Sequence, residues 1–167
     1  MTYPRIELGG IPLDIRAGEV VESDSPITAS VIVRMGLGSG IQLTPWSRAA
    51  GSLRGSGGWI PPGLDGLDFS QPLELKLTSP ESITGPGPVF DLHCDARPDK
   101  APWAFAEVQG EWVPAECVAA GRSVSVAVVP GAVRYRVHWM PRYWVFAKKP
   151  PRDRSRSFDW TIEWEEV

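Results

Sequence analysis

The last strand-like run of the chain, residues 158–166, alternates apolar and polar side chains more regularly than any other segment. Its apolar positions are Phe158, Trp160, Ile162 and Trp164, and its polar positions are Asp159, Thr161, Glu163 and Glu165. Successive side chains of a β-strand point to opposite faces, so the run predicts a strand with aromatic rings toward a core and carboxylates toward water. No segment has a convincing 3.6-residue periodicity, so we expect no long helix.

Glycine and proline set the general architecture. The 167 residues include 17 glycines and 17 prolines, about a fifth of the chain. This density favours many short strands joined by turns. The sequence therefore predicts an all-β protein, an antiparallel β-sandwich or barrel of about ten short strands with long Gly/Pro-rich loops. The length suits a single domain, residues 1–167, with residues 86–131 as a candidate for an inserted hairpin layer.

Turn signals separate several pairs of strand-like runs. Tight hairpin turns need backbone conformations that glycine adopts freely, so glycine-containing dipeptides between such runs indicate hairpins. We expect three hairpins, with turns at Gly9-Gly10, Gln109-Gly110 and Pro130-Gly131. The third would join residues 123–129 to residues 133–139.

The first half of the chain contains one further strand pair and two candidate loops. Residues 27–35 are rich in β-branched side chains and predict a central strand that returns as residues 41–46. Residues 47–58 are polar and glycine-rich, and we expect them to be mobile unless a partner orders them. Residues 79–88, rich in proline and glycine, are the best candidate for a linker.

Residues 55–70 combine a glycine cluster and a Pro-Pro-Gly turn with apolar side chains. Glycine and proline shape such a segment without making it helix or sheet. We interpret it as a rigid, folded-back assembly loop, and we expect Trp59→Ala to impair assembly more than subunit folding. Its candidate interface residues are Trp59, Ile60, Leu64 and Leu67.

Charge is segregated along the chain. The net charge is −3, yet residues 134–158 carry eight basic groups and one acidic group, while residues 159–167 carry four acidic groups. Segregated charge suits surfaces that meet complementary copies, although these charges can equally neutralise each other across adjacent strands. The charged interface candidates are Arg142, Lys148, Lys149, Arg152, Arg154, Arg156, Glu163 and Glu165.

Residues 93–95, His-Cys-Asp, are the strongest catalytic or metal candidates, with Cys117 and His138 as helpers. If this segment is a strand, His93 and Cys94 point to opposite faces, so one site cannot easily use both. No Cys-x-x-Cys or His-x₃-His spacing is present, and the glycine runs lack the spacing of a phosphate-binding loop. We therefore expect no catalytic residue, metal site or cofactor, and two reduced cysteines.

The sequence has no feature typical of a membrane protein or of a nucleic-acid-binding protein. No run approaches the ~20 apolar residues of a membrane helix, and residues 1–7 lack the apolar stretch of a signal peptide. Residues 148–156 are basic, but the chain is acidic overall and has no nucleic-acid-binding motif, so we expect a solvated connection or a protein contact there. We expect no membrane and no nucleic-acid partner.

Two segments carry a family resemblance. Residues 55–72 resemble a stretch of small structural proteins of tailed-phage and prophage tail modules. The ending, residues 143–146 followed by a charged connection and residues 158–167, is similar to the close of many minor tail proteins. The resemblance covers about a quarter of the chain. It implies a β-rich, unsecreted protein without cofactors or catalytic residues that assembles as a ring at the tail end or baseplate.

We therefore expect a non-enzymatic virion protein of the tail tip, distal tail ring or baseplate of a tailed phage. It would be made in the host cytoplasm, and its partners would be copies of itself and other tail proteins. One alternative is a capsid or neck accessory protein. Another is a carbohydrate- or receptor-binding β-module that uses exposed Trp46, Trp59, Trp103 or Trp112. The weakest is a cysteine hydrolase that pairs Cys94 or Cys117 with His138.

Overall fold

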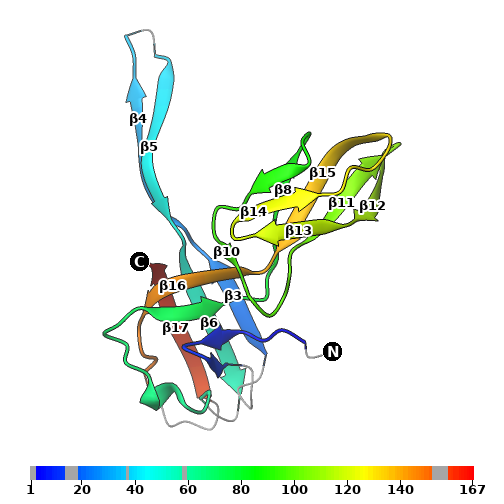
Figure 1. Ribbon diagram of the computed structural model, residues 1–167. Helices are drawn as coiled ribbons and strands as arrows, with labels where there is room; N and C mark the ends of the chain where they lie inside the picture. Colours follow the sequence, from blue (N-terminus) through cyan, green and yellow to red (C-terminus); the bar gives the residue numbers. More distant parts are fainter. Residues whose placement is uncertain (1–2, 14–18, 37, 58–59, 152–157) are drawn as a thin grey trace. The chain divides into compact units, whose positions relative to one another are not determined.

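A computed structural model describes residues 3–13, 19–36, 38–57, 60–151 and 158–167 (Figure 1). The described chain is nearly all β, with seventeen strands, antiparallel sheets and one short 3₁₀ turn, η1 (Leu64–Gly66). The prediction of an antiparallel all-β fold is confirmed. The strands outnumber the ten or so expected, because several segments predicted as loops are themselves short strands.

The chain divides into two compact units, each built from two segments. Unit 1 contains Met1–Pro12 and Glu74–Tyr143, and unit 2 contains Leu13–Leu73 and Trp144–Val167. Residues 86–131, the candidate inserted layer, lie within the second segment of unit 1. The strand β16 (Pro141–Ala147) contributes its first residues to unit 1 and its last to unit 2.

Unit 1 contains a four-stranded and a three-stranded antiparallel sheet. The first has the order β12 (Glu111–Ala115), β11 (Trp103–Val108), β15 (Ala132–Trp139) and β8 (Glu81–Gly85). The second has the order β13 (Cys117–Ala120), β14 (Ser123–Val126) and β9 (Val89–Asp91). A further group contains the start of β16 with β1 (Glu7–Leu8), β2 (Ile11–Pro12), β7 (Leu73–Lys76) and β10 (Asp95–Ala96).

The core of unit 1 lies between its sheets. The ring of Phe90 on β9 lies against Gly85 on β8, where a Cβ would be 3.1 Å from the ring. The Tyr135 hydroxyl accepts a hydrogen bond from the backbone N–H of Val129 at 3.2 Å. The other buried side chains come from the inward positions of the strands and include Ala104, Ala106, Val124, Val126, Val137 and Trp139. Inward and outward positions alternate, as expected for a sheet with one buried face.

Arg97, at the end of β10, is a buried charged residue of unit 1 and is only 1% exposed. Its guanidinium donates two hydrogen bonds to the Asp99 carboxylate, at 2.8 and 2.7 Å. It donates two more to the backbone carbonyls of Arg5 and Leu77, at 2.9 and 3.0 Å. The four bonds join three separate segments of the unit through one side chain.

Two of the three expected hairpins are confirmed. Gly9 and Gly10 both have positive φ, 57° and 79°, between β1 and β2, and Gln109 and Gly110 have φ of 53° and 86° between β11 and β12. The third hairpin is wrong. β14 pairs with β13 and β9, whereas β15 pairs with β11 and β8. Residues 117–120 supply β14 with a nearer partner across a tight turn at Gly121, so Gly131 lies in a connection between two sheets.

Unit 2 is organised around the antiparallel strands β16, β17 (Phe158–Glu166), β6 (Ala50–Gly57) and β3 (Val20–Asp24), in this order. On β17 the side chains of Trp160, Ile162 and Trp164 are buried, while Asp159, Glu163 and Glu165 are exposed. The alternation predicted for this strand is confirmed at the side chains that the structure describes. Its core partners include Leu53 on β6 and Val145 on β16.

The strand β6 contradicts the expected mobile loop at residues 47–58. Gly51 lies opposite Trp164 and Gly55 opposite Trp160 in the β6–β17 register. A Cβ on Gly55 would lie 2.5 Å from Cε2 of Trp160, so the indole covers the space that a side chain would fill. The glycines therefore serve to accommodate two Trp rings in a sheet, rather than to loosen a loop.

Two other expectations are also wrong. The linker candidate, residues 79–88, contains β8, which pairs along its length with β15. Residues 27–35 do not form a central strand: within the described part of the chain, β4 (Ile27–Arg34) pairs only with β5 (Gly40–Arg48), in a two-stranded sheet. β-branched composition therefore identified a strand but not its place in a sheet, because a β-branched side chain suits an exposed strand too.

Candidate functional site

The most distinctive surface of unit 2 is the hairpin of β4 and β5, here called the arm (Figure 1). It continues the β3–β6 ladder through a hydrogen bond from the Ser25 N–H to the Ala50 carbonyl at 2.8 Å. Beyond this bond, among the residues that the structure describes, the two strands pair only with each other, from Ile27↔Arg48 to Arg34↔Gly40. An isolated two-stranded hairpin is at best marginally stable in water, so the arm lacks the support that a third strand would give.

The arm has one apolar and one mainly polar face. Val31 lies opposite Leu43, and Val33 lies opposite Ile41, so these four side chains share one face. They are well exposed, Val31 by 58% and Leu43 by 51%. The opposite face contains Ile32 together with polar side chains, among which Gln42 Nε2 donates to Ser30 Oγ at 2.9 Å. A continuous aliphatic strip in water marks a surface that a partner can cover.

Both strands of the arm are also sheet edges, because the sheet has only two strands. Each edge presents backbone N–H and C=O groups that can pair with another strand. A register shift between Ala29 and Val31 and the proline at position 45 interrupt the regular ladder near the base of the arm. The part from Val31 outward is therefore the more regular template for strand addition.

The structure describes three of the four apolar assembly candidates. Leu64, on η1, is buried, whereas Ile60 and Leu67 are half-buried. Trp59 lies outside the described residues, as do Arg152, Arg154 and Arg156. A buried side chain such as Leu64 supports the fold of its own subunit, so an assembly role for the loop stays a prediction.

Four of the charged candidates that the structure describes have partners within the chain. Arg142 contacts Glu74 at 3.5 Å and Asp95 at 3.2 Å. Lys149 contacts Asp65 at 2.9 Å. Lys148 contacts Glu163 at 2.7 Å, and its hydrogen bond lowers the pKa of the Glu163 carboxyl. Glu165 is exposed. The pairs of Arg142 with β7 and β10 fit the interpretation in which charges neutralise each other across adjacent strands, whereas Lys149 pairs with η1.

The structure describes three of the four candidate Trp residues of the binding-module alternative. Trp46 lies on the arm and is half exposed. Trp103 stacks on His138 with ring centroids 5.6 Å apart, and Arg136 lies 4.1 Å from the ring centroid of Trp112. These neighbours cover part of each ring. Trp59 is outside the described residues, Trp46 belongs to unit 2, and Trp103 and Trp112 lie on neighbouring strands of unit 1.

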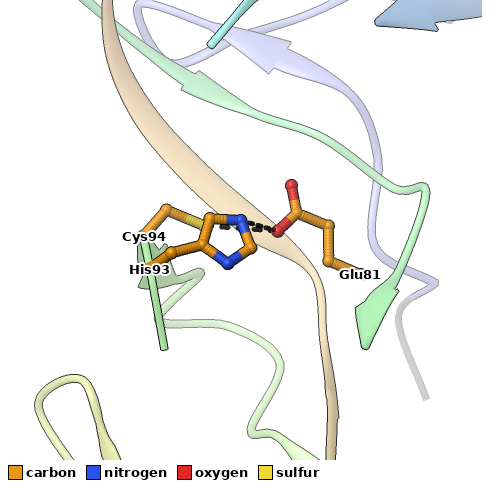
Figure 2. Close-up of side chains that lie close together, drawn as sticks. All are labelled: Glu81, His93 and Cys94. Carbon is orange, nitrogen blue, oxygen red and sulfur yellow. Dashed lines mark hydrogen bonds and ion pairs between the residues drawn. The ribbon is translucent and has the colours of Figure 1, made fainter. Parts of the chain in front are cut away.

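A second cluster lies in unit 1, where Glu81 on β8 approaches His93 and Cys94 (Figure 2). Their ligand atoms all lie within 4.8 Å of one another. The expectation that His93 and Cys94 point to opposite faces is wrong. The strand β9 ends at Asp91, and both residues lie in a bend before β10, which turns both side chains toward Glu81.

The cluster is supported by two aromatic donors. Trp139 Nε1 donates to the Cys94 sulfur at 3.2 Å, and the Tyr143 hydroxyl donates to Glu81 Oε1 at 2.7 Å. Burial raises the pKa of Tyr143, so its hydroxyl keeps the proton that it donates. Burial also raises the pKa of the Cys94 thiol to about 11. Cys94 therefore lacks the low pKa that a nucleophilic cysteine needs at neutral pH.

Both cysteines have free thiols, which allows their reactivity to be compared directly. Cys94 is buried, whereas Cys117 is half-buried with its sulfur 3.4 Å from the Pro102 carbonyl. We expect iodoacetamide to modify Cys94 at least about tenfold more slowly than Cys117, because alkylation needs an accessible thiolate. Peptide mass spectrometry over time measures both rates. Faster modification of Cys94 would favour the cysteine-hydrolase alternative.

Sequence reasoning identified His93 and Cys94 but missed Glu81, which lies in the segment predicted as a linker. It also missed the arm as a surface. No helix within the described part of the chain has the length and apolar character needed to cross a membrane. Comparisons of the chain with protein-family models, with curated proteins and with solved structures found no match.

Proposed function

We propose that this chain is a non-enzymatic structural subunit of the tail tip, distal tail ring or baseplate of a tailed phage. It acts by assembling with copies of itself and with other tail proteins. The observation that supports this function most directly is the arm, where four exposed aliphatic side chains share one face of a two-stranded hairpin. The segmental resemblance to minor tail proteins and the antiparallel all-β fold agree with it.

The occupant of the arm is a second copy of this chain. The arm contains Arg34 and Arg48 and no acidic residue. Among the described strands, β3 is the edge of the unit 2 sheet, and residues 19–24 at this edge include Glu19, Glu22 and Asp24 and no basic residue. A basic ribbon with free edges and an acidic edge strand are complementary in charge and in backbone pairing.

A contact between arm and β3 edge joins two different patches of neighbouring copies. Such a heterologous contact closes into a ring when its rotation permits. Burial of an aliphatic side chain gives about 1.5–3 kcal/mol, so the four-residue apolar face is sufficient to contribute a large part of the subunit affinity. The arm thus provides the kind of interface that a tail ring requires.

The apolar face can be tested by a matched pair of variants. We expect Val33→Glu with Leu43→Glu to weaken self-association by at least about 100-fold, since it replaces two buried apolar contacts of the interface by carboxylates without partners. The control, Thr28→Glu with Gln42→Glu, adds the same charge to the other face and should leave assembly nearly unchanged. Native mass spectrometry and negative-stain microscopy measure the oligomer.

Three results would contradict the proposal. The first is a wild-type chain that stays monomeric at tens of micromolar, alone and with proteins encoded by neighbouring genes. The second is an equal loss of assembly in both variants. The third is an oligomer that the apolar-face variant leaves intact. Circular dichroism of both variants distinguishes a lost contact from a lost fold.

A further inference from the structure

The cluster of Glu81, His93 and Cys94 contains three kinds of ligand atom on two separate segments of unit 1: a carboxylate oxygen, an imidazole nitrogen and a sulfur. Thiolate, imidazole and carboxylate are the three side-chain ligands that Zn²⁺ binds in proteins. Metals of the calcium and magnesium type take oxygen ligands instead. We propose that these residues bind one Zn²⁺ ion per chain, with three protein ligands and a fourth position open to solvent.

The spacing of the donor atoms is close to what such an ion requires. Glu81 Oε2 lies 2.5 Å from His93 Nε2 and 3.7 Å from the Cys94 sulfur. Around a tetrahedral zinc with bonds of about 2.0–2.3 Å, neighbouring ligand atoms lie about 3.5 Å apart. The glutamate–cysteine spacing already fits this value. The glutamate–histidine pair has to open by about an ångström to admit the ion.

The exposures of the three residues allow this movement. The His93 side chain is 64% exposed, so its ring can rotate outward without disturbing the core. Cys94, by contrast, is only 2% exposed and holds a fixed position behind it. The ion would therefore enter from the solvent side, between a movable imidazole and a fixed sulfur. The same exposed side leaves room for a water molecule as the fourth ligand.

Neighbouring groups hold the proposed ligands in place. The Tyr143 hydroxyl donates to Glu81 Oε1, the oxygen that does not contact His93, and so leaves Oε2 directed at the site. The Trp139 N–H donates to the Cys94 sulfur, an interaction that favours a thiolate. The ring of Trp139 also meets the His93 imidazole edge to face at 5.2 Å. Hydrogen bonds of this kind orient metal ligands in established zinc sites.

The competing explanation is that the cluster is only a hydrogen-bonded pair of Glu81 and His93 beside a buried thiol. The two explanations differ in a measurable way, because only a metal site converts the Cys94 thiol to a coordinated thiolate. Co²⁺ replaces Zn²⁺ in such sites and gives a thiolate-to-cobalt charge-transfer absorption. This absorption reports directly on a sulfur ligand.

The experiment uses the full-length chain, reduced, stripped with a chelator and free of any histidine tag. Titration with Co²⁺ is expected to produce the charge-transfer band and to saturate at one ion per chain. Addition of Zn²⁺ should abolish the band, and competition with a chromophoric chelator gives the zinc affinity. A wild-type chain without the band, or without zinc binding in the competition, would overturn the proposal.

Three variants complete the test. We expect His93→Ala and Glu81→Gln each to weaken zinc binding more than about 100-fold, because each variant removes a direct ligand. Loss of a residue that only supports a ligand by a hydrogen bond costs about 10- to 100-fold. Because His93 is exposed, its variant should fold normally, as circular dichroism can verify. The matched control is Cys117→Ser, which removes the other thiol and should keep full binding. Unchanged affinity in folded His93→Ala, or loss of the band in Cys117→Ser, would contradict the assignment.

Discussion

Replacing Gly55 by alanine is expected to lower the free energy of unfolding by about 3 kcal/mol, since overpacking a filled core commonly costs 1–3 kcal/mol or more. The added Cβ would lie 2.5 Å from Cε2 and 2.7 Å from Nε1 of Trp160. Trp160 is only 2% exposed, so a shift of its ring would disturb the packed side chains around it. Urea denaturation monitored by Trp fluorescence measures the loss.

A control and a rescue make this expectation specific to the packing of the indole. Gly66→Ala, in the same unit, places a Cβ where nothing lies within 4 Å, and it should change stability by less than about 1 kcal/mol. Combining Gly55→Ala with Trp160→Phe should cost at least about 1 kcal/mol less than the sum of the two single changes. Additive losses would show that the alanine acts through backbone conformation instead.

The second large effect concerns the buried guanidinium of Arg97. We expect Arg97→Met to destabilise the chain by about 3 kcal/mol, because the carbonyls of Arg5 and Leu77 lose their donor in a buried setting. Arg97→Lys should also be destabilising, since a single ammonium cannot reproduce the planar fork that serves Asp99 and the two carbonyls together. Chemical denaturation of the three chains gives the comparison.

An exposed arginine of unit 1 supplies the matched control. Arg134 contacts Glu107 at 2.6 Å, yet its side chain is 57% exposed. Arg134→Met should therefore cost less than about 1 kcal/mol, the usual range for a surface ion pair. Equal losses of unfolding free energy for Arg97→Met and Arg134→Met would mean that burial of the Arg97 guanidinium does not increase its contribution to stability.

Sequence patterns predicted local strands well and their assembly into sheets poorly. The alternation of residues 158–166 and the turns at Gly9-Gly10 and Gln109-Gly110 depend on neighbouring residues only, and these predictions are confirmed. The pairing of β14 depends on which strand reaches it in space, and the prediction of its partner is wrong. The strand at residues 50–57 was not predicted, because the tryptophans that pack against its glycines lie on another strand, β17, more than 100 residues later in the sequence.

The candidate site was only partly predictable for the same reason. The side-chain chemistry of His93 and Cys94 marked them as candidates in the sequence. Their approach to Glu81 depends on a bend after Asp91, where β9 ends. The arm was recognised as two strands, yet its exposure follows from the absence of a third strand beside it in the described chain. Period-two patterns report which side chains share a face, and they do not report whether anything covers that face.

The interleaving of the two units has a consequence for synthesis on the ribosome. Unit 1 has all its strands once residue 143 has emerged, so it can fold while later residues are still being added. Unit 2 must wait, because β17 lies between β6 and β16 in its sheet and follows every other strand of that unit in the chain. Until then, β6 can pair only with β3, and the edge of β6 that β17 will occupy stays open. The interval before translation reaches β17 is thus when this protein most needs a chaperone.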